Sequence, residues 1–131
     1  MAKVSITKHV EFEAAHYLPD YDGKCATMHG HSYKLDVTIS CDSLIKEGPE
    51  KGMVIDFVDL KRMIQVITGS FDHRVINDVA PYRPTAENMT IDIYDRLNRM
   101  LDCQQDFLMR DVKCSRVRLW ETSTSFAEVE E

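Results

Sequence analysis

The sequence lacks the features that would place the protein in a membrane, in a disulfide scaffold or on a nucleic acid. Its 131 residues contain no apolar run of the roughly 20 residues that a membrane-spanning helix needs. Its four cysteines form no Cys-x-x-Cys pair, so we expect neither a disulfide framework nor a four-cysteine zinc site. Sixteen Lys and Arg against 22 Asp and Glu give a formal net charge of −6, which disfavours nucleic acid or an acidic membrane face as a partner.

Two further absences concern organisation. No apolar signal-peptide region stands at the amino end, so we expect a cytoplasmic protein. No repeat, low-complexity stretch or Pro/Gly-rich linker divides the chain, which predicts a single domain over residues 1–131. A hydrophobic fraction of 44% and a charged fraction of 29% are those of an ordinary globular protein.

Two segments near the amino end alternate between apolar and polar residues, which is typical of half-buried β-strands. The first covers residues 6–16 and the second residues 33–39, and the turn-forming stretch 18–24 lies between them. Two long strands joined by a loop predict an antiparallel pair.

The middle of the chain changes to the three- and four-residue apolar spacing of amphipathic helices. Asp56 is expected to cap a first helix, which ends at Gly69. Thr85 is expected to cap a second helix that carries Glu87 in its positive first turn and an apolar stripe as far as Leu101. Both helices thus have one face to bury.

Alternation with a period of two returns over residues 112–121 and again over residues 126–129. The order β-β-α-α-β-β predicts an α+β fold, an antiparallel sheet with two helices on one face. Such a sheet leaves one face and its edges open, which predicts a homo-oligomer that continues the sheet across subunits. The alternative is a monomer whose charged Glu-Val-Glu-Glu tail guards the edge.

Three of the five histidines have a spacing suited to a metal ion. His29 and His31 flank Gly30, so an extended backbone directs both imidazoles to one face with their Cα atoms about 6.6 Å apart. His16 ends the first strand on its apolar face, and strand pairing would bring it opposite the other two. Three neutral imidazoles suit a catalytic Zn²⁺ with an open position, whereas a single buried histidine is usually a hydrogen-bonded core residue. His9 belongs to the opposite face and is expected in solvent.

Cys25 lies four residues before His29, and two roles compete for it. As a fourth ligand it would close the coordination sphere and make the site structural, whereas as a free thiol it would carry a proton to or from a substrate. The other cysteines are expected to be small, inert hydrophobic residues. These are Cys41, Cys103 and Cys114.

Two acidic motifs are further candidates. Asp72 can orient the imidazole of His73 and raise its basicity as in a general base, or the pair can serve only as a turn. Glu121 ends the third strand, where its carboxylate can accept two hydrogen bonds from an amidine-like or aminopyrimidine edge, or simply be solvated.

Taken in order, these motifs resemble the 6-pyruvoyltetrahydropterin synthase / 6-carboxytetrahydropterin synthase family over nearly the whole chain. Three residues separate Cys25 from His29, and this spacing is similar to that in the bacterial carboxy-type branch. The matching segments are Phe12-Glu-Ala-Ala-His16, Cys25-Ala-Thr-Met-His-Gly-His-Ser-Tyr33, Gly52-Met-Val-Ile-Asp-Phe57, Asp72-His73, Asn77-Asp78, Pro84-Thr-Ala-Glu-Asn88 and Glu121-Thr122.

The resemblance implies the tunnelling fold, in which subunits join their sheets into a barrel, commonly a hexamer with active sites at the interfaces. It implies conversion of 7,8-dihydroneopterin triphosphate to 6-carboxy-5,6,7,8-tetrahydropterin with loss of acetaldehyde and triphosphate, an early step toward queuosine and related 7-deazapurines. With a net charge of −6, the chain must gather local cations for a triphosphate. The candidates are Lys24, Lys34, Arg74 and Arg83.

The same resemblance implies a role for each site residue. His16, His29 and His31 would bind Zn²⁺, and Cys25 would be the proton-transferring thiol. Asp72-His73 would be the second acid/base group. The anchor for the aminopyrimidine edge of the pterin would be Glu121, aided by Thr85 and Glu87.

Several alternatives stay open on the residues alone. Within the family they are a pyruvoyl-type synthase and a side-chain-cleaving relative that makes a folate precursor. A zinc hydrolase would use the open metal position for hydroxide and would not need Cys25. A structural zinc or pterin-binding module would use Cys25 as a fourth ligand.

Overall fold

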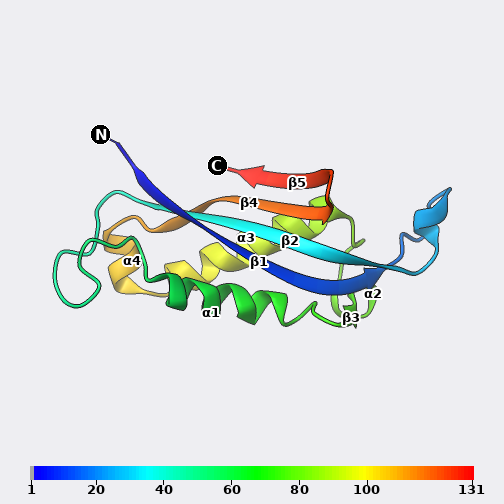
Figure 1. Ribbon diagram of the computed structural model, residues 1–131, viewed down its shortest axis with the longest axis horizontal. Coiled ribbons are helices and arrows are strands. Elements are labelled where there is room, and N and C mark those ends of the chain that lie inside the picture. Colours follow the sequence, from blue (N-terminus) through cyan, green and yellow to red (C-terminus); the bar gives the residue numbers. More distant parts are fainter. Residues whose placement is uncertain (1) are drawn as a thin grey trace.

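The computed structural model describes residues 2–131 as a five-stranded sheet with the two long helices packed on one face (Figure 1). The strand order across the sheet is β3-β1-β2-β4-β5. The predicted α+β order is confirmed, with four additional short elements. In chain order the elements are β1 (Val4–His16), η1 (Lys24–Ala26), β2 (His29–Cys41), α1 (Phe57–Thr68), β3 (Arg74–Val75), α2 (Ile76–Val79), α3 (Ala86–Asp102), α4 (Gln105–Met109), β4 (Lys113–Thr122) and β5 (Ser125–Glu130).

The strands β1 and β2 form an antiparallel pair along their whole length, as predicted. The register runs from Val4 opposite Cys41 to His16 opposite His29. This register follows from the hydropathy pattern, because a slip of one residue would turn every buried side chain to the other face. The side chains of β1 on the core face are those of Val10, Phe12, Ala14 and His16, all buried.

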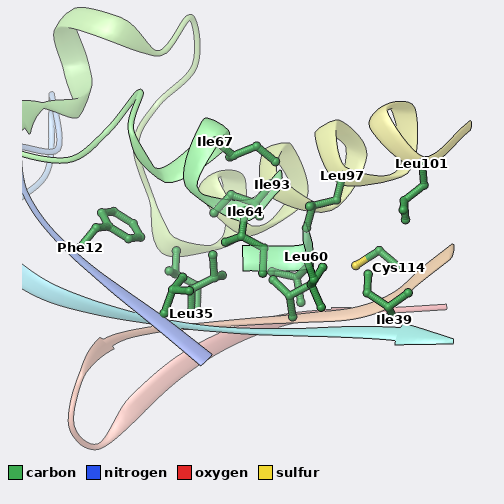
Figure 2. Close-up of a cluster of buried hydrophobic side chains, with 14 of the residues drawn as sticks. Phe12, Leu35, Ile39, Leu60, Ile64, Ile67, Ile93, Leu97, Leu101 and Cys114 are labelled. Carbon is green, nitrogen blue, oxygen red and sulfur yellow. The ribbon is translucent and has the colours of Figure 1, made fainter. Parts of the chain in front are cut away.

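The helices α1 and α3 cover the core face of the sheet with their apolar stripes. Figure 2 shows Leu60, Ile64, Ile93 and Leu97 between the helices and the strands. These four side chains are fully buried. Burial of a large aliphatic side chain contributes about 1.5–3 kcal/mol, so this layer accounts for much of the fold's stability. No helix within residues 2–131 is both long and apolar enough to cross a membrane.

Both predicted helix starts have the expected caps. The carboxylate of Asp56 accepts a hydrogen bond from the Val58 N–H at 2.8 Å, and the Thr85 hydroxyl accepts one from the Asn88 N–H at 3.1 Å. Gly69 ends α1 with a right-handed φ of −61°. A Cβ at this position would lie 2.9 Å from the Gln65 carbonyl oxygen, which is why a glycine stands there.

Sequence patterning did not predict the segment that follows α1. Its elements β3 and α2 have two and four residues, too few for a hydropathy period to be recognised. β3 pairs in parallel with β1 at Ala14 and Ala15, so the sheet is not wholly antiparallel. This pairing brings the Asp72-His73 pair to the end of β1, where the His73 N–H donates to the Glu13 carbonyl at 2.6 Å.

The cysteines differ from one another in their surroundings. Cys41 and Cys114 are buried, as predicted for inert hydrophobic residues. Cys103 is exposed, which corrects the prediction for this residue. It follows the last residue of α3 as the C-cap, a position that faces water.

The sheet has two open edges within the described residues. The outer edge of β1 meets β3 only at Ala14 and Ala15, so within the described residues no strand pairs with residues 4–13 on the side away from β2. β5 forms the other edge. Unpaired edge strands of this length are usually covered or paired, so the fold is compatible with a sheet that continues into a second subunit.

Candidate metal centre and substrate site

The structure brings together the three histidines predicted to bind a metal. The strand register places His16 directly opposite His29, and His31 lies two residues farther along the same face. The Nε2 atoms of His16 and His29 are 3.0 Å apart. One ring nitrogen from each of the three residues lies within 4.8 Å of the others, which is close enough to hold one ion.

Main-chain carbonyls determine the tautomers of two of these rings. Nδ1 of His16 lies 2.8 Å from the Pro84 carbonyl oxygen, and Nδ1 of His29 lies 2.7 Å from that of Thr27. Since a carbonyl oxygen only accepts, each Nδ1 carries the proton and each neutral ring keeps its lone pair on Nε2. Two lone pairs 3.0 Å apart repel each other unless a cation lies between them. The donor set therefore fits a divalent metal ion.

His31 supplies a second indication of a metal. Its Nε2 is buried and has no hydrogen-bond partner within residues 2–131. Burial lowers the pKa of this imidazole, His16 and His29 lower it further, and the carboxylate of Glu121 opposes them. The ring is thus neutral near pH 7 and offers an unshared lone pair, the form that binds a metal.

Glu121 lies on the same side of the sheet, beside the histidines. Its carboxylate oxygens are 3.7 Å from Nε2 of His31 and 3.8 Å from Nε2 of His16. Together with Glu87 it lines a cavity of about 300 Å³, whose other walls come from Ala86 and β5. The structure therefore joins the predicted metal ligands to two of the three predicted substrate-binding residues. The third, Thr85, stands one residue before Ala86 and uses its hydroxyl oxygen to cap α3.

The Asp72-His73 pair belongs to a different cavity from that of Glu121, because His73 lines it and Glu121 does not. Nδ1 of His73 is 3.0 Å from Oδ1 of Asp72, and the same oxygen accepts the Glu13 N–H at 3.0 Å. His73 adopts a left-handed φ of 58°, an uncommon backbone conformation for histidine. Its side chain is exposed, and with Arg74 and His31 it lines a cavity of about 420 Å³.

The pKa of Asp72 predicts a pH-dependent contribution to stability. The N–H of Glu13 foremost, and His73 next, hold this pKa below its ordinary value of 3.8. The carboxylate therefore stabilises the fold above that value, and the contribution is lost as the pH falls through the lowered pKa. We expect Asp72→Asn to reduce the free energy of unfolding more at about pH 7 than at about pH 2, as measured by urea denaturation. Equal reductions at both pH values would contradict this assignment.

Cys25 is separated from the histidine cluster. It lies in η1, within the loop that extends beyond the paired ends of β1 and β2 (Figure 1), and its side chain is partly exposed. Among residues 2–131 the group of ring nitrogens within 4.8 Å does not include its sulfur. The geometry of one chain therefore provides three ligands and leaves the thiol free.

The candidate cations are dispersed. Arg74 shares a cavity with His31, whereas Arg83 donates to the Pro19 carbonyl at 3.1 Å beside another cavity. Lys34 stands opposite Glu11 on the open face of the sheet. Lys24 is exposed in η1. Of the four candidate cations, only Arg74 lines one of these cavities together with a predicted metal ligand, His31.

Several residues that shape the site were missed in the sequence. Besides the carbonyls of Pro84 and Thr27, the Tyr33 hydroxyl lies 3.5 Å from Nδ1 of His16, and burial raises the pKa of this phenol above its usual range. Asn77 holds the residue after His16, accepting the Tyr17 N–H at 3.0 Å and donating to its carbonyl at 2.9 Å. A main-chain carbonyl that accepts a hydrogen bond leaves no signal in the sequence. The sequence indicated Asn77 only as part of the Asn77-Asp78 motif.

Fold and site together define an α+β protein with three histidines, placed closely enough to hold a metal ion, at the paired ends of two strands. The family model for 6-pyruvoyl tetrahydropterin synthase matches residues 5–131. The chain belongs to this family of enzymes.

Individual relatives agree with this assignment. A 6-carboxy-5,6,7,8-tetrahydropterin synthase from Haemophilus influenzae is 38% identical over 148 residues, covering 96% of this chain and 98% of that protein. A dihydroneopterin monophosphate aldolase from Pyrococcus furiosus is 30% identical over 128 residues, covering 98% of each protein. The structure of the Caenorhabditis elegans 6-pyruvoyl tetrahydropterin synthase matches with a TM-score of 0.78 at 22% identity, covering 100% of this chain and 97% of that chain. The fold is thus the tunnelling fold expected from the sequence.

Proposed function

We propose that this protein is a zinc-dependent 6-carboxy-5,6,7,8-tetrahydropterin synthase, a lyase that converts 7,8-dihydroneopterin triphosphate and one water to 6-carboxytetrahydropterin, acetaldehyde and triphosphate. The observation that carries the proposal is the convergence of three imidazoles beside the carboxylate of Glu121. The similarity to the Haemophilus influenzae synthase over almost the full length of both proteins supports the choice of reaction. The product would serve the biosynthesis of queuosine and related 7-deazapurines.

In this proposal His16, His29 and His31 hold the zinc through their Nε2 atoms. Zinc bound there would polarise and acidify hydroxyl groups of the substrate side chain. The carbonyls of Pro84 and Thr27 keep the Nδ1 protons on His16 and His29, so both rings present lone pairs without a change of tautomer. Burial keeps His31 neutral.

Glu121 orients the pterin ring. Its carboxylate is an acceptor for two N–H groups of the aminopyrimidine edge, and such charge-assisted pairs are both strong and directional. Glu87 lines the same cavity and Thr85 stands at its margin, so the first turn of α3 forms the second wall of the pterin site. The side chain of a pterin held in this way extends toward the three histidines.

Cys25 and the Asp72-His73 pair supply the proton transfers. Oδ1 of Asp72 lies 3.0 Å from Nδ1 of His73 and orients the ring, which leaves Nε2 of His73 to exchange a proton with the substrate. His73 and Glu121 line different cavities, and the Cys25 sulfur lies outside the histidine group, so we propose that neighbouring subunits complete each site. The open edges of β1 and β5 are the surfaces through which a homohexamer would form.

Glu121→Gln tests the pterin anchor. Glutamine keeps one acceptor oxygen but loses the charge, and a hydrogen bond to a charged group contributes about 1.5–3 kcal/mol. We therefore expect KM to rise roughly 10- to 100-fold in steady-state assays while zinc remains bound. Glu128→Gln is the matched control, because Glu128 pairs with Arg118 on the open face of the sheet. A KM for Glu121→Gln equal to that of the control would contradict the anchor.

Analysis of the products by mass spectrometry tests the reaction itself. Formation of 6-carboxytetrahydropterin and acetaldehyde from 7,8-dihydroneopterin triphosphate is expected. A second function is favoured by the similarity to the Pyrococcus furiosus dihydroneopterin monophosphate aldolase. That function predicts cleavage of the monophosphate substrate, and turnover of the monophosphate with no carboxypterin from the triphosphate would replace our proposal by it.

A further inference from the structure

The Pro84 carbonyl fixes the tautomer of His16. Its oxygen lies 2.8 Å from Nδ1 of a ring that is 2% exposed, so no water competes for that proton. The proton on Nδ1 leaves the Nε2 lone pair directed at His29, 3.0 Å away. The direction of one main-chain carbonyl thus bears on how the three histidines hold a metal.

The peptide unit that carries this carbonyl is held from its other side as well. The N–H of the same unit, that of Thr85, donates to the Arg83 carbonyl at 2.8 Å. Because a peptide is planar, the acceptor of its N–H also determines where its C=O points. Nδ2 of Asn88 donates to the same Arg83 carbonyl at 3.0 Å. Asn88 therefore holds the acceptor on which the direction of the Pro84 carbonyl depends.

We infer that Asn88 is a positioning residue for the metal site, an inference that rests on the metal binding proposed above. Its side-chain amide orders the Arg83 carbonyl, this carbonyl orients the Pro84–Thr85 peptide, and that peptide sets the tautomer and angle of His16. The main-chain N–H of Asn88 also donates to the Thr85 hydroxyl at 3.1 Å. One asparagine thus ties the first turn of α3, which lines the pterin cavity, to a ligand of the metal.

Two substitutions remove the amide donor in different ways. Asn88→Asp keeps the shape but cannot donate to the Arg83 carbonyl when ionised, and its charge in the first turn of α3 favours the helix. Asn88→Ala removes the donor without adding charge. Asn98 offers matched controls, since it lies on the same helix, donates to the Cys114 carbonyl at 3.2 Å and accepts the Cys114 N–H at 2.9 Å. Asn98→Asp and Asn98→Ala make the same changes away from the site.

The measurement is zinc affinity by competition with a chromophoric chelator, together with the visible spectrum of the Co²⁺-substituted protein. We expect both Asn88 variants to bind zinc about tenfold more weakly, a loss typical for partners of metal ligands, and to change the Co²⁺ spectrum. Imidazole ¹⁵N signals of the metal-free protein should show Nδ1-protonated His16 in the wild type and mixed tautomers in Asn88→Ala. The Asn98 variants should match the wild type in all three readouts.

The outcomes separate this inference from the function on which it rests. If the Asn88 variants equal the Asn98 variants in zinc affinity and Co²⁺ spectrum, Asn88 has no positioning role and the metal site stands without it. If the wild-type protein binds no zinc, the proposed function fails and the inference fails with it.

Discussion

His31→Ala will abolish zinc binding and turnover together. Removing one of three histidines leaves only two protein donors, and the affinity loss should exceed the roughly 100-fold upper range seen for outer partners of metal ligands. Without metal, the melting temperature of the variant should be close to that of the wild type, since the substitution removes a buried nitrogen that has no hydrogen-bond partner in residues 2–131. Zinc should therefore raise the melting temperature of the wild type and leave that of the variant unchanged.

His9→Ala is the control for this experiment. His9 lies on the same strand as His16 but on the open face, where Nδ1 contacts Asp36 at 2.7 Å. At a free zinc concentration 100 times the Kd, binding adds about 2.7 kcal/mol to the stability of a protein that binds only when folded. The wild type and His9→Ala should both show this gain. A zinc-dependent gain in His31→Ala would remove His31 from the ligand set.

Cys25→Ala will reduce kcat about 10²- to 10⁴-fold while zinc affinity stays at the wild-type value. The reason is that the thiol lies outside the group of three ring nitrogens and, in our proposal, transfers a proton instead of binding metal. Turnover and zinc content are measured on the same preparations. Cys103→Ala, which alters the exposed thiol at the end of α3, should leave both unchanged.

The two alternatives for Cys25 give opposite results. Loss of zinc from Cys25→Ala would make the thiol a fourth ligand and the site structural. Full turnover with zinc bound would favour a hydrolase that needs no thiol. Mixing subunits of Cys25→Ala with subunits of Glu121→Gln tests the shared site, because activity above that of either variant arises only if neighbouring subunits complete one another.

The long elements were predictable because each repeats a local pattern many times. β1 and β2 have 13 residues each and α3 has 17, so their hydropathy periods are unambiguous. The same reasoning failed for β3, α2 and α4, which have two, four and five residues and are held by contacts with other elements. Cys103 was misjudged for a related reason, since the end of an amphipathic pattern does not show which residue first leaves the core.

The sequence by itself determined that His29 and His31 leave one face of a strand and that His16 ends the buried face of another. Alternation along a strand is a consequence of local backbone geometry, so no knowledge of packing is required. Only the tertiary structure decided which groups complete the centre. The Pro84 carbonyl reaches His16 across 68 residues and Asp72 reaches Glu13 across 59, because the helices pack on the sheet in one particular way. Contacts over such separations depend on the whole core, and no local pattern encodes them.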